Sequence, residues 1–341
     1  MMRLIGPLFL ALVLAAVPGH ADAHALDPGY LNLQKMPGAG WRVFWRKPAV
    51  QGQPMAIDAR LPDTCSPAQA TESRFDGIAW VSRWVAICPG GLGGQRIAIT
   101  GLEATRTDVL VRIKGGGEGG KSATLTVRLT PDAPQFEVPR DLSTGQVFVS
   151  YLALGFDHIL EGADHLLFVF ALLVLIQSPW RLAGAITAFT VAHSITLALA
   201  TLGVLRVPTP PVEAAIALSI VLLAVEILRR QTSGEQLAEK YPWIISFAFG
   251  LLHGLGFAGA LSEIGLPAGD IPMALLAFNL GVEAGQLAFV AAVLALYAAL
   301  RFGLPKLATG LRAPGAPGTV IMGYGIGTVS IYWLIERVAA F

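Results

Sequence analysis

The sequence predicts an all-α polytopic membrane bundle of about six transmembrane helices, preceded by a small all-β, sandwich-like periplasmic domain. Hydrophobic residues make up 54% of the 341 residues, charged residues make up only 14%, and the mean hydropathy is +0.61. This composition excludes a disordered chain and is unlike that of a water-soluble globular protein. The apolar excess is confined to residues 145–341, whereas residues 24–143 have an ordinary polar composition.

The charge balance excludes one class of partner. The chain has 24 Lys and Arg residues against 23 Asp and Glu residues, so its net charge is +1, and it has no basic tract. Proteins that bind nucleic acid through electrostatics carry a clustered excess of positive charge. We therefore expect no nucleic-acid partner.

The first 23 residues have the pattern of a secretory signal peptide. Arg3 supplies a positive start, residues 4–17 are apolar, and Ala21-Asp22-Ala23 forms a cleavage site of the A-x-A type. We expect cleavage after Ala23, which makes residues 24–143 a periplasmic domain. An uncleaved N-terminal anchor is the alternative, and it would leave this domain on the same side of the membrane.

Residues 24–143 have the pattern of an all-β domain, because short runs rich in Val, Ile, Thr and Trp alternate with Pro and Gly. The expected strands fall within residues 41–45, 55–60, 78–87, 96–100, 109–113 and 123–129, and the glycine-rich residues 115–120 predict a hairpin loop. Cys65 and Cys88 are the only cysteines, and both lie in this domain. An oxidising compartment favours a disulfide between them, and two free buried thiols are the alternative.

Six apolar stretches follow in the domain 145–341, and each is long enough to cross about 30 Å of hydrocarbon. They cover residues 156–176, 182–205, 212–228, 243–262, 272–300 and 320–338. If the chain enters the membrane from the periplasm, the outer loops carry only Arg206, and the cytoplasmic loops carry Arg181, Arg229, Arg230, Lys240, Arg301, Lys306 and Arg312. This asymmetry follows the positive-inside rule. We expect a multi-pass protein of the bacterial inner membrane whose N-terminal domain and C-terminus are both periplasmic.

Ionisable residues interrupt these stretches, although each costs about 2.5–3.5 kcal/mol near the bilayer centre. On a continuous helix, five of them share a sector of about 120° of the first stretch, and four of the six histidines in the chain lie in the membrane. Imidazole with carboxylate suits Ni, Co, Zn or Fe, and the lack of cysteine in the stretches argues against Cu(I) or an iron–sulfur cluster. A helix–helix hydrogen bond is the alternative role for a single buried histidine. The predicted metal ligands are Asp157, His158, Glu161, Asp164, His165, His193, Glu226, His253 and Glu283.

At these positions the sequence resembles the HupE/UreJ family, the membrane accessories of nickel hydrogenase and urease, and specifically the subgroup with an N-terminal extracytoplasmic domain. The resemblance covers residues 145–341, and it rests on the repeated Asp-His pairs 157–158 and 164–165, on segments 189–196 and 249–257, and on Asn279-x3-Glu283-x2-Gln286. It implies a nickel or related divalent-metal permease in which His158, Asp164 and His165 match the metal-binding element. Two departures are visible. Leu152-Ala153-Leu154 replaces the His-Pro of shorter members, and the spacing after His158 is one residue longer than in nickel–cobalt transporters.

Three functions remain open at this point. The first is a metal permease. In it Asp157, His158 and Glu161 capture the cation, a central group holds it, and Glu226 receives it on the inner side; the central group is Asp164, His165, His193, His253 and Glu283. The second is a non-transporting metallochaperone or assembly factor whose β domain docks a protein or ligand in the periplasm. The third is an intramembrane Zn-dependent hydrolase, but the chain has no His-Glu-x-x-His helix, so we expect no enzyme. The expected partners are the metal ion and membrane lipid.

Overall fold

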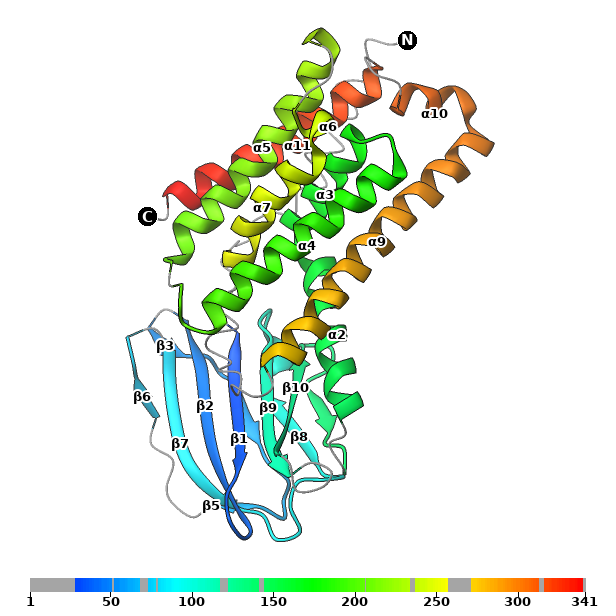
Figure 1. Cartoon of the computed structure of the whole chain (residues 1–341). Helices are drawn as coiled ribbons and strands as arrows, with labels where there is room; N and C mark the ends of the chain where they lie inside the picture. Colours follow the sequence, from blue (N-terminus) through cyan, green and yellow to red (C-terminus); the bar gives the residue numbers. More distant parts are fainter. Residues whose placement is uncertain are drawn as a thin grey trace.

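The computed structural model consists of a β domain and a helical bundle stacked end to end (Figure 1). The predicted signal peptide lies outside the residues that the structure describes. The described residues are 28–50, 52–67, 73–77, 79–116, 122–140, 144–205, 207–233, 237–256, 271–312 and 316–339.

The β domain contains two sheets. The larger sheet has the strand order β10-β9-β1-β2-β7-β5, with β3 paired to β2 and β6 paired to β7. Its strands are β1 (Gly29–Lys35), β2 (Gly40–Val50), β3 (Gln53–Pro54), β5 (Ser66–Pro67), β6 (Ser73–Phe75), β7 (Ala79–Ile87), β9 (Val109–Gly116) and β10 (Ser122–Leu129). The smaller sheet has the order β11-β8-β4, and its strands are β4 (Asp58–Arg60), β8 (Arg96–Thr100) and β11 (Gln135–Glu137). A single 3-10 turn, η1 (Leu102–Ala104), follows β8.

Alternating side chains explain why these strands form a sandwich. Successive residues of a strand point to opposite faces, and Leu31, Leu33 and Val43 of the larger sheet are fully buried at such alternating positions. Ile97 and Ile99 of β8 are equally buried and belong to the same apolar cluster. The predicted sandwich-like β domain is therefore confirmed.

The six expected strand regions each contain a strand, but β1 and the short strands β3, β5, β6 and β11 lie outside these regions. β1 pairs parallel with β9 and antiparallel with β2, so it joins the two halves of the larger sheet. Residues 115 and 116 of the predicted hairpin loop continue β9, and residues 117–120 lie outside the described residues.

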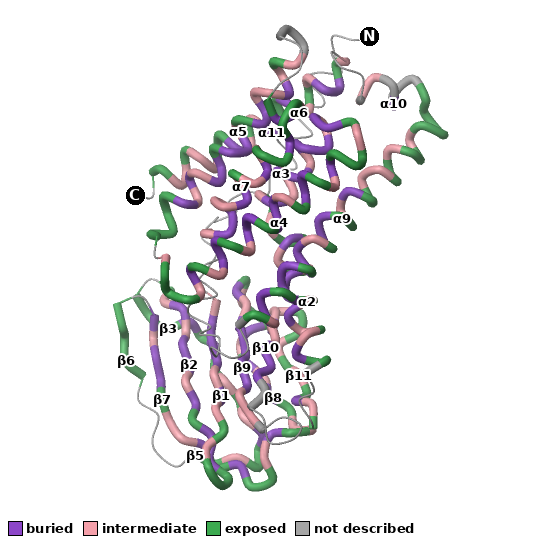
Figure 2. Tube along the Cα trace, viewed as in Figure 1, coloured by how far each residue is buried: buried purple, intermediate pink, exposed green. Residues whose placement is uncertain are grey.

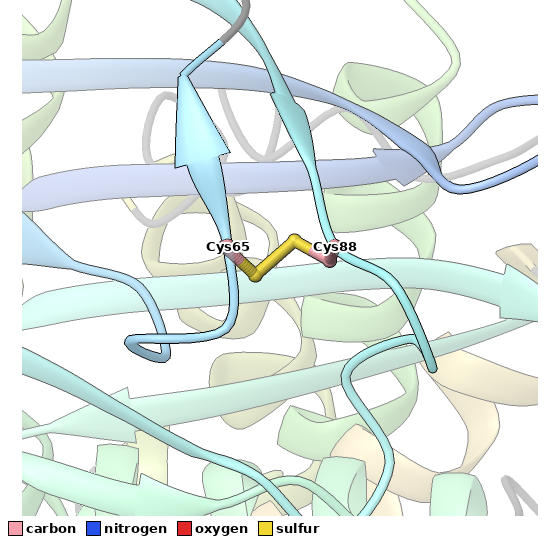
Figure 3. Close-up of a disulfide and its surroundings, with 2 residues drawn as sticks. All are labelled: Cys65 and Cys88. Atoms are coloured by element: carbon pink, nitrogen blue, oxygen red, sulfur yellow. A yellow bond between two sulfur atoms is a disulfide. The ribbon is translucent and has the colours of Figure 1, made fainter.

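A disulfide joins Cys65 to Cys88, as predicted (Figure 3). Cys65 lies directly before β5 and Cys88 lies directly after β7, and the two are 23 residues apart in sequence. The bond therefore closes a loop around the edge of the larger sheet, and the alternative of two free thiols is excluded.

Among the residues that the structure describes, the helical bundle contains four helices that are long and apolar enough to cross a membrane, α4, α5, α9 and α11. The bent pair α2–α3 makes a fifth candidate span. The six predicted apolar stretches all begin on helices, and α7 is the shorter helix of the fourth stretch, which runs on into residues outside the described part. The fold class is confirmed, and the chain is a multi-pass membrane protein. The helices are α2 (Thr144–Glu161), α3 (Ala163–Leu175), α4 (Pro179–Thr201), α5 (Thr209–Ser233), α6 (Leu237–Lys240), α7 (Pro242–Gly256), α9 (Ile271–Gly303), α10 (Pro305–Arg312) and α11 (Pro317–Ala339).

The outer surface of the bundle is suited to lipid. Figure 2 shows long exposed faces on α5, α9 and α11, and large apolar side chains such as Leu296 lie on them. Trp180, Trp243 and Phe302 are exposed at helix ends that lie away from the β domain (Figure 1). Aromatic side chains collect in this way at a membrane–water interface.

The β domain packs directly on α2. Tyr30 and Leu110 of the larger sheet share an apolar cluster with Val147 and Tyr151 of α2, and the hydroxyl groups of Thr126 and Tyr151 lie 3.0 Å apart. The β domain therefore contacts the same helix that carries the first of the membrane histidines.

Candidate metal centre

Four histidines lie in the half of the bundle nearer the β domain. His158 is in the last turn of α2, His165 in the first turn of α3, His193 in α4, and His253 in the last turn of α7. His193 and His253 are fully buried, His165 is nearly so, and His158 is partly buried. Four different helices thus deliver the imidazoles to one region.

A sharp bend brings the first two histidines together. α2 and α3 meet at 73°, and Gly162 between them has an extended backbone with φ −71° and ψ 90°. On a straight helix His158 and His165 would be separated by about 10.5 Å along the axis, at 1.5 Å per residue, whereas their ring centroids are 5.0 Å apart. The prediction of one continuous helix across residues 156–176 was wrong, because the chain leaves helical geometry at Gly162.

Three of the imidazoles form a compact donor set. The ring of His193 lies 6.2 Å from that of His158 and 6.1 Å from that of His165. One ligand nitrogen from each of the three residues lies within 4.8 Å of the other two. Tetrahedral coordination at about 2.0 Å places neighbouring ligand atoms roughly 3.3 Å apart, so a small inward movement would complete a three-histidine site.

The hydrogen bonds of His165 and His193 fix which ring nitrogen carries the proton. Asp164 Oδ1 lies 2.9 Å from His165 Nδ1, and a carboxylate can only accept, so Nδ1 is the donor. Asn279 donates through Nδ2 to the carbonyl of Leu275 at 2.7 Å, which leaves its Oδ1 to accept from His193 Nδ1 at 3.1 Å.

Both imidazoles therefore keep a lone pair on Nε2. These two buried nitrogens have no hydrogen-bond partner among the residues that the structure describes. A buried polar atom of this kind is costly, and a metal ion would satisfy both. A carboxylate or amide on the far ring nitrogen is the arrangement that orients metal-binding histidines in proteins.

His253 lies beside this set and is oriented in the same way. Ser219 donates its single proton to the carbonyl of Ile216 at 2.6 Å, so its Oγ accepts from His253 Nε2 at 3.3 Å. Nδ1 of His253 then carries the lone pair and is buried without a partner in the described part of the chain. The rings of His253 and His165 are 4.9 Å apart, but His253 does not belong to the three-histidine group.

The predicted carboxylates are placed at other positions. Asp164 orients His165, and Asp157 is exposed on α2. Glu161 pairs with Arg128 of β10, which also pairs with Asp108. The structure therefore brings three of the nine predicted ligands into one donor set, and uses Asp164 to orient one of them.

Two further predicted ligands bond to neighbouring groups. Glu283 accepts a hydrogen bond of 2.6 Å from Thr187. Glu226 accepts one of 2.8 Å from the backbone N–H of Ala238, at the start of α6 and the end of the bundle far from the β domain. These residues lie outside the donor set.

Two residues that support the centre were not predicted. Asn279 was placed on the correct helix face, but its role as the partner of His193 was not foreseen. Arg337 in the last turn of α11 lies 3.8 Å from Asp164 and 3.9 Å from Glu213. The available signal was an arginine in the last turn of the final apolar stretch, where a charge needs a partner.

The comparison with known proteins agrees with this architecture. A family profile described as HupE / UreJ protein matches residues 134–337, which include all the helices that carry the histidines. No curated protein matches the chain, and no solved structure matches it. The matched segment covers more than half of the chain, and the chain therefore belongs to the HupE/UreJ family.

Proposed function

We propose that this protein is a divalent transition-metal permease that carries nickel and supplies it for metalloenzyme maturation. The observation that carries the proposal is the three-histidine donor set with two orphaned Nε2 atoms, buried in a multi-pass membrane protein. Membership in the HupE/UreJ family supports nickel, because the family is associated with hydrogenase and urease.

The donor set also suits nickel on chemical grounds, together with other divalent transition metals. Imidazole suits Ni, Co, Zn and Fe, and thiolate is the ligand that selects Cu(I) and iron–sulfur clusters. Both cysteines of the chain form the disulfide of the β domain, so neither supplies a thiolate.

The remaining predicted ligands fit a path through the same bundle. Asp157 is exposed at the β-domain end and would attract a cation, and Glu161 lies one turn further on but is paired with Arg128. Asp164 holds His165 in its binding tautomer. Glu283 follows Asn279 by four residues on α9, hence on the same face. Glu226 lies at the far end, where an outgoing cation would meet it.

We propose that the β domain is periplasmic and that the cation enters from this side. The C-terminal ends of α4 and α11 point towards the β domain, whereas the C-terminal end of α9 and the whole of α10 lie at the opposite end of the bundle (Figure 1). Most of the basic loop residues belong to that opposite end. In intact cells an impermeant maleimide is expected to label Asp132→Cys and to leave Leu237→Cys unlabelled. Labelling of Leu237→Cys would invert the path. The native cysteines are bridged and do not react.

Transport itself is tested with the purified chain in liposomes that contain a metal-sensitive dye. Addition of Ni²⁺ outside is expected to raise the internal signal above that of protein-free liposomes, with smaller responses to Co²⁺, Zn²⁺, Fe²⁺ and Mn²⁺. Ni²⁺ binding without uptake would favour the second candidate function, a non-transporting metallochaperone. The observation in its favour is the buried apolar cluster next to the histidines, which offers no ligand for a cation to pass through. The absence of both Ni²⁺ binding and Ni²⁺ uptake would overturn the proposal.

A further inference from the structure

A layer of three phenylalanines lies directly beyond the histidines. Phe168 follows His165 by three residues, Phe189 precedes His193 by four, and Phe249 precedes His253 by four, so each phenylalanine is one helical turn from a histidine. α3 runs away from the β domain, whereas α4 and α7 run towards it (Figure 1). All three phenylalanines therefore lie on the side of the histidines that faces away from the β domain.

The rings of this phenylalanine layer touch one another and the imidazoles. Phe168 lies 5.1 Å from Phe189 and 5.9 Å from Phe249, measured between centroids. His253 lies 5.2 Å from Phe168 and 5.1 Å from Phe189. Phe168 and Phe189 are fully buried and Phe249 is half-buried, so aromatic rings pack against the histidines on this side.

The layer is continuous with the apolar core in the far half of the bundle. Phe168 and Phe189 share one buried cluster with side chains of α3, α4 and α5, including Leu172, Ile186 and Leu223. A divalent cation that leaves the histidines in this direction would meet no ligand in that cluster. Hydrophobic constrictions of this kind stop ions by excluding the water that would accompany them.

From this geometry we propose that Phe168, Phe189 and Phe249 form the closed inner gate of the metal path. The inference rests on the permease proposal and extends it: the structure represents the state in which the metal site is shut towards the end opposite the β domain. On α3 and α4 a residue of this gate lies one turn from a histidine of the donor set, and on α7 Phe249 lies one turn from His253, which is beside that set.

α7 is the helix that couples the gate to the histidines. It carries Phe249 and His253 one turn apart, and it packs closely on α4, because a Cβ added at Gly250 would meet the carbonyl of Phe189 and one added at Gly254 would meet that of His193. A shift of α7 along α4 therefore separates Phe249 from Phe168 and displaces His253 from His165 in one movement.

The test uses Ser246 as a reporter beyond the gate. Ser246 is fully buried on α7, three residues past Phe249 on the far side, and its Oγ has no partner in the described part of the chain. In the full-length Ser246→Cys protein in liposomes, a charged methanethiosulfonate reagent is added from the β-domain side. Cys labelling is expected to be negligible with the native gate and at least about tenfold faster with Phe168→Ala plus Phe189→Ala, because the dry constriction is removed.

Matched variants separate gating from damage. Phe170→Ala changes the same residue type on the same helix but outside the layer, and is expected to leave labelling unchanged. Phe168→Leu plus Phe189→Leu keeps an apolar layer and is expected to keep the reporter protected. If the double alanine variant does not fold, Phe249→Ala, which removes a half-buried ring, serves in its place.

The outcomes are distinct from those of the permease proposal. Rapid labelling of Ser246→Cys with the native phenylalanines, or equal labelling with and without the alanine substitutions, would overturn the gate. Ni²⁺ affinity is measured on the same proteins and is expected to be retained in Phe170→Ala and in the leucine variant, which keeps apolar side chains against the histidines. A native chain that binds no Ni²⁺ would instead contradict the permease proposal and leave the labelling result to decide the gate.

Discussion

Replacing His165 or His193 by alanine is expected to lower the affinity for Ni²⁺ by about 100-fold or more, since removing a direct ligand exceeds the loss of an orienting group. Each of these imidazoles offers a lone pair that no other described group uses. Each tenfold loss corresponds to about 1.4 kcal/mol of binding free energy. Titration of Ni²⁺ into the detergent-solubilised variants, followed by calorimetry, measures the change directly.

The orienting residues should give a graded result. Asp164→Leu and Asn279→Leu leave all the imidazoles in place but remove the acceptors that set their tautomers, so a loss of about 10- to 100-fold is expected. Ser194→Ala is the control, because this hydroxyl lies next to His193 on α4 and bonds to the carbonyl of Thr190. If alanine at His158, His165 and His193 together leaves the affinity unchanged, the centre is wrongly assigned.

Proton competition gives the same site a pH dependence. Imidazole must be neutral to bind a metal, so protons compete with the cation for the same ring nitrogens. Ni²⁺ affinity should therefore fall as the pH decreases, in agreement with a donor set made of imidazoles.

The sequence pointed to the candidate site because of the cost of charge in a membrane. Asp157 to His165 form a dense run of ionisable groups at the edge of an apolar stretch, and His193 and His253 each interrupt an apolar helix. These signals are local, so they could be recognised without knowing how the helices pack. The class of ligand followed from the side-chain chemistry alone.

The exact donor set could not be predicted because it depends on one backbone break and on contacts between distant segments. The helical sector calculated for residues 157–165 fails at Gly162, where the chain turns by 73°. Glu161 pairs with Arg128 only because the β domain docks on α2. Neither the angle at a glycine nor the docking of two domains is encoded in a periodic pattern.

The same limit applies to the fold. Alternation predicted strands such as β2 and β7, and β1 carries the same local pattern, because Asn32 and Gln34 alternate with its buried leucines, but it was overlooked. Its parallel pairing with β9 joins segments about 80 residues apart, and such long-range pairing leaves no local signal. The apolar helices were predicted correctly because their length and composition suffice.

Substitution of Gly155 or Gly281 by alanine is expected to destabilise the bundle by about 1–3 kcal/mol, the usual cost of overpacking. A Cβ added at Gly155 would meet the carbonyl oxygen of Phe278, and one added at Gly281 would meet that of Leu152. The two glycines therefore hold α2 and α9 in close contact from both sides. Backbone atoms cannot rotate away as a side chain can, so the helices must separate.

Separation of α2 and α9 should also weaken metal binding. This second effect distinguishes the two substitutions from a general loss of stability. His158 follows Gly155 by one turn on α2, and Asn279 directly follows Phe278 on α9, so the same movement displaces one ligand and the partner of another. Gly184→Ala on α4 is the matched control, because a Cβ there meets nothing within 4 Å, and it should leave stability unchanged or slightly raised. Thermal unfolding in detergent and Ni²⁺ titration measure the two effects. If the Gly155→Ala and Gly281→Ala proteins have the same unfolding temperature and the same Ni²⁺ affinity as the unsubstituted protein, this helix contact does not position the metal centre.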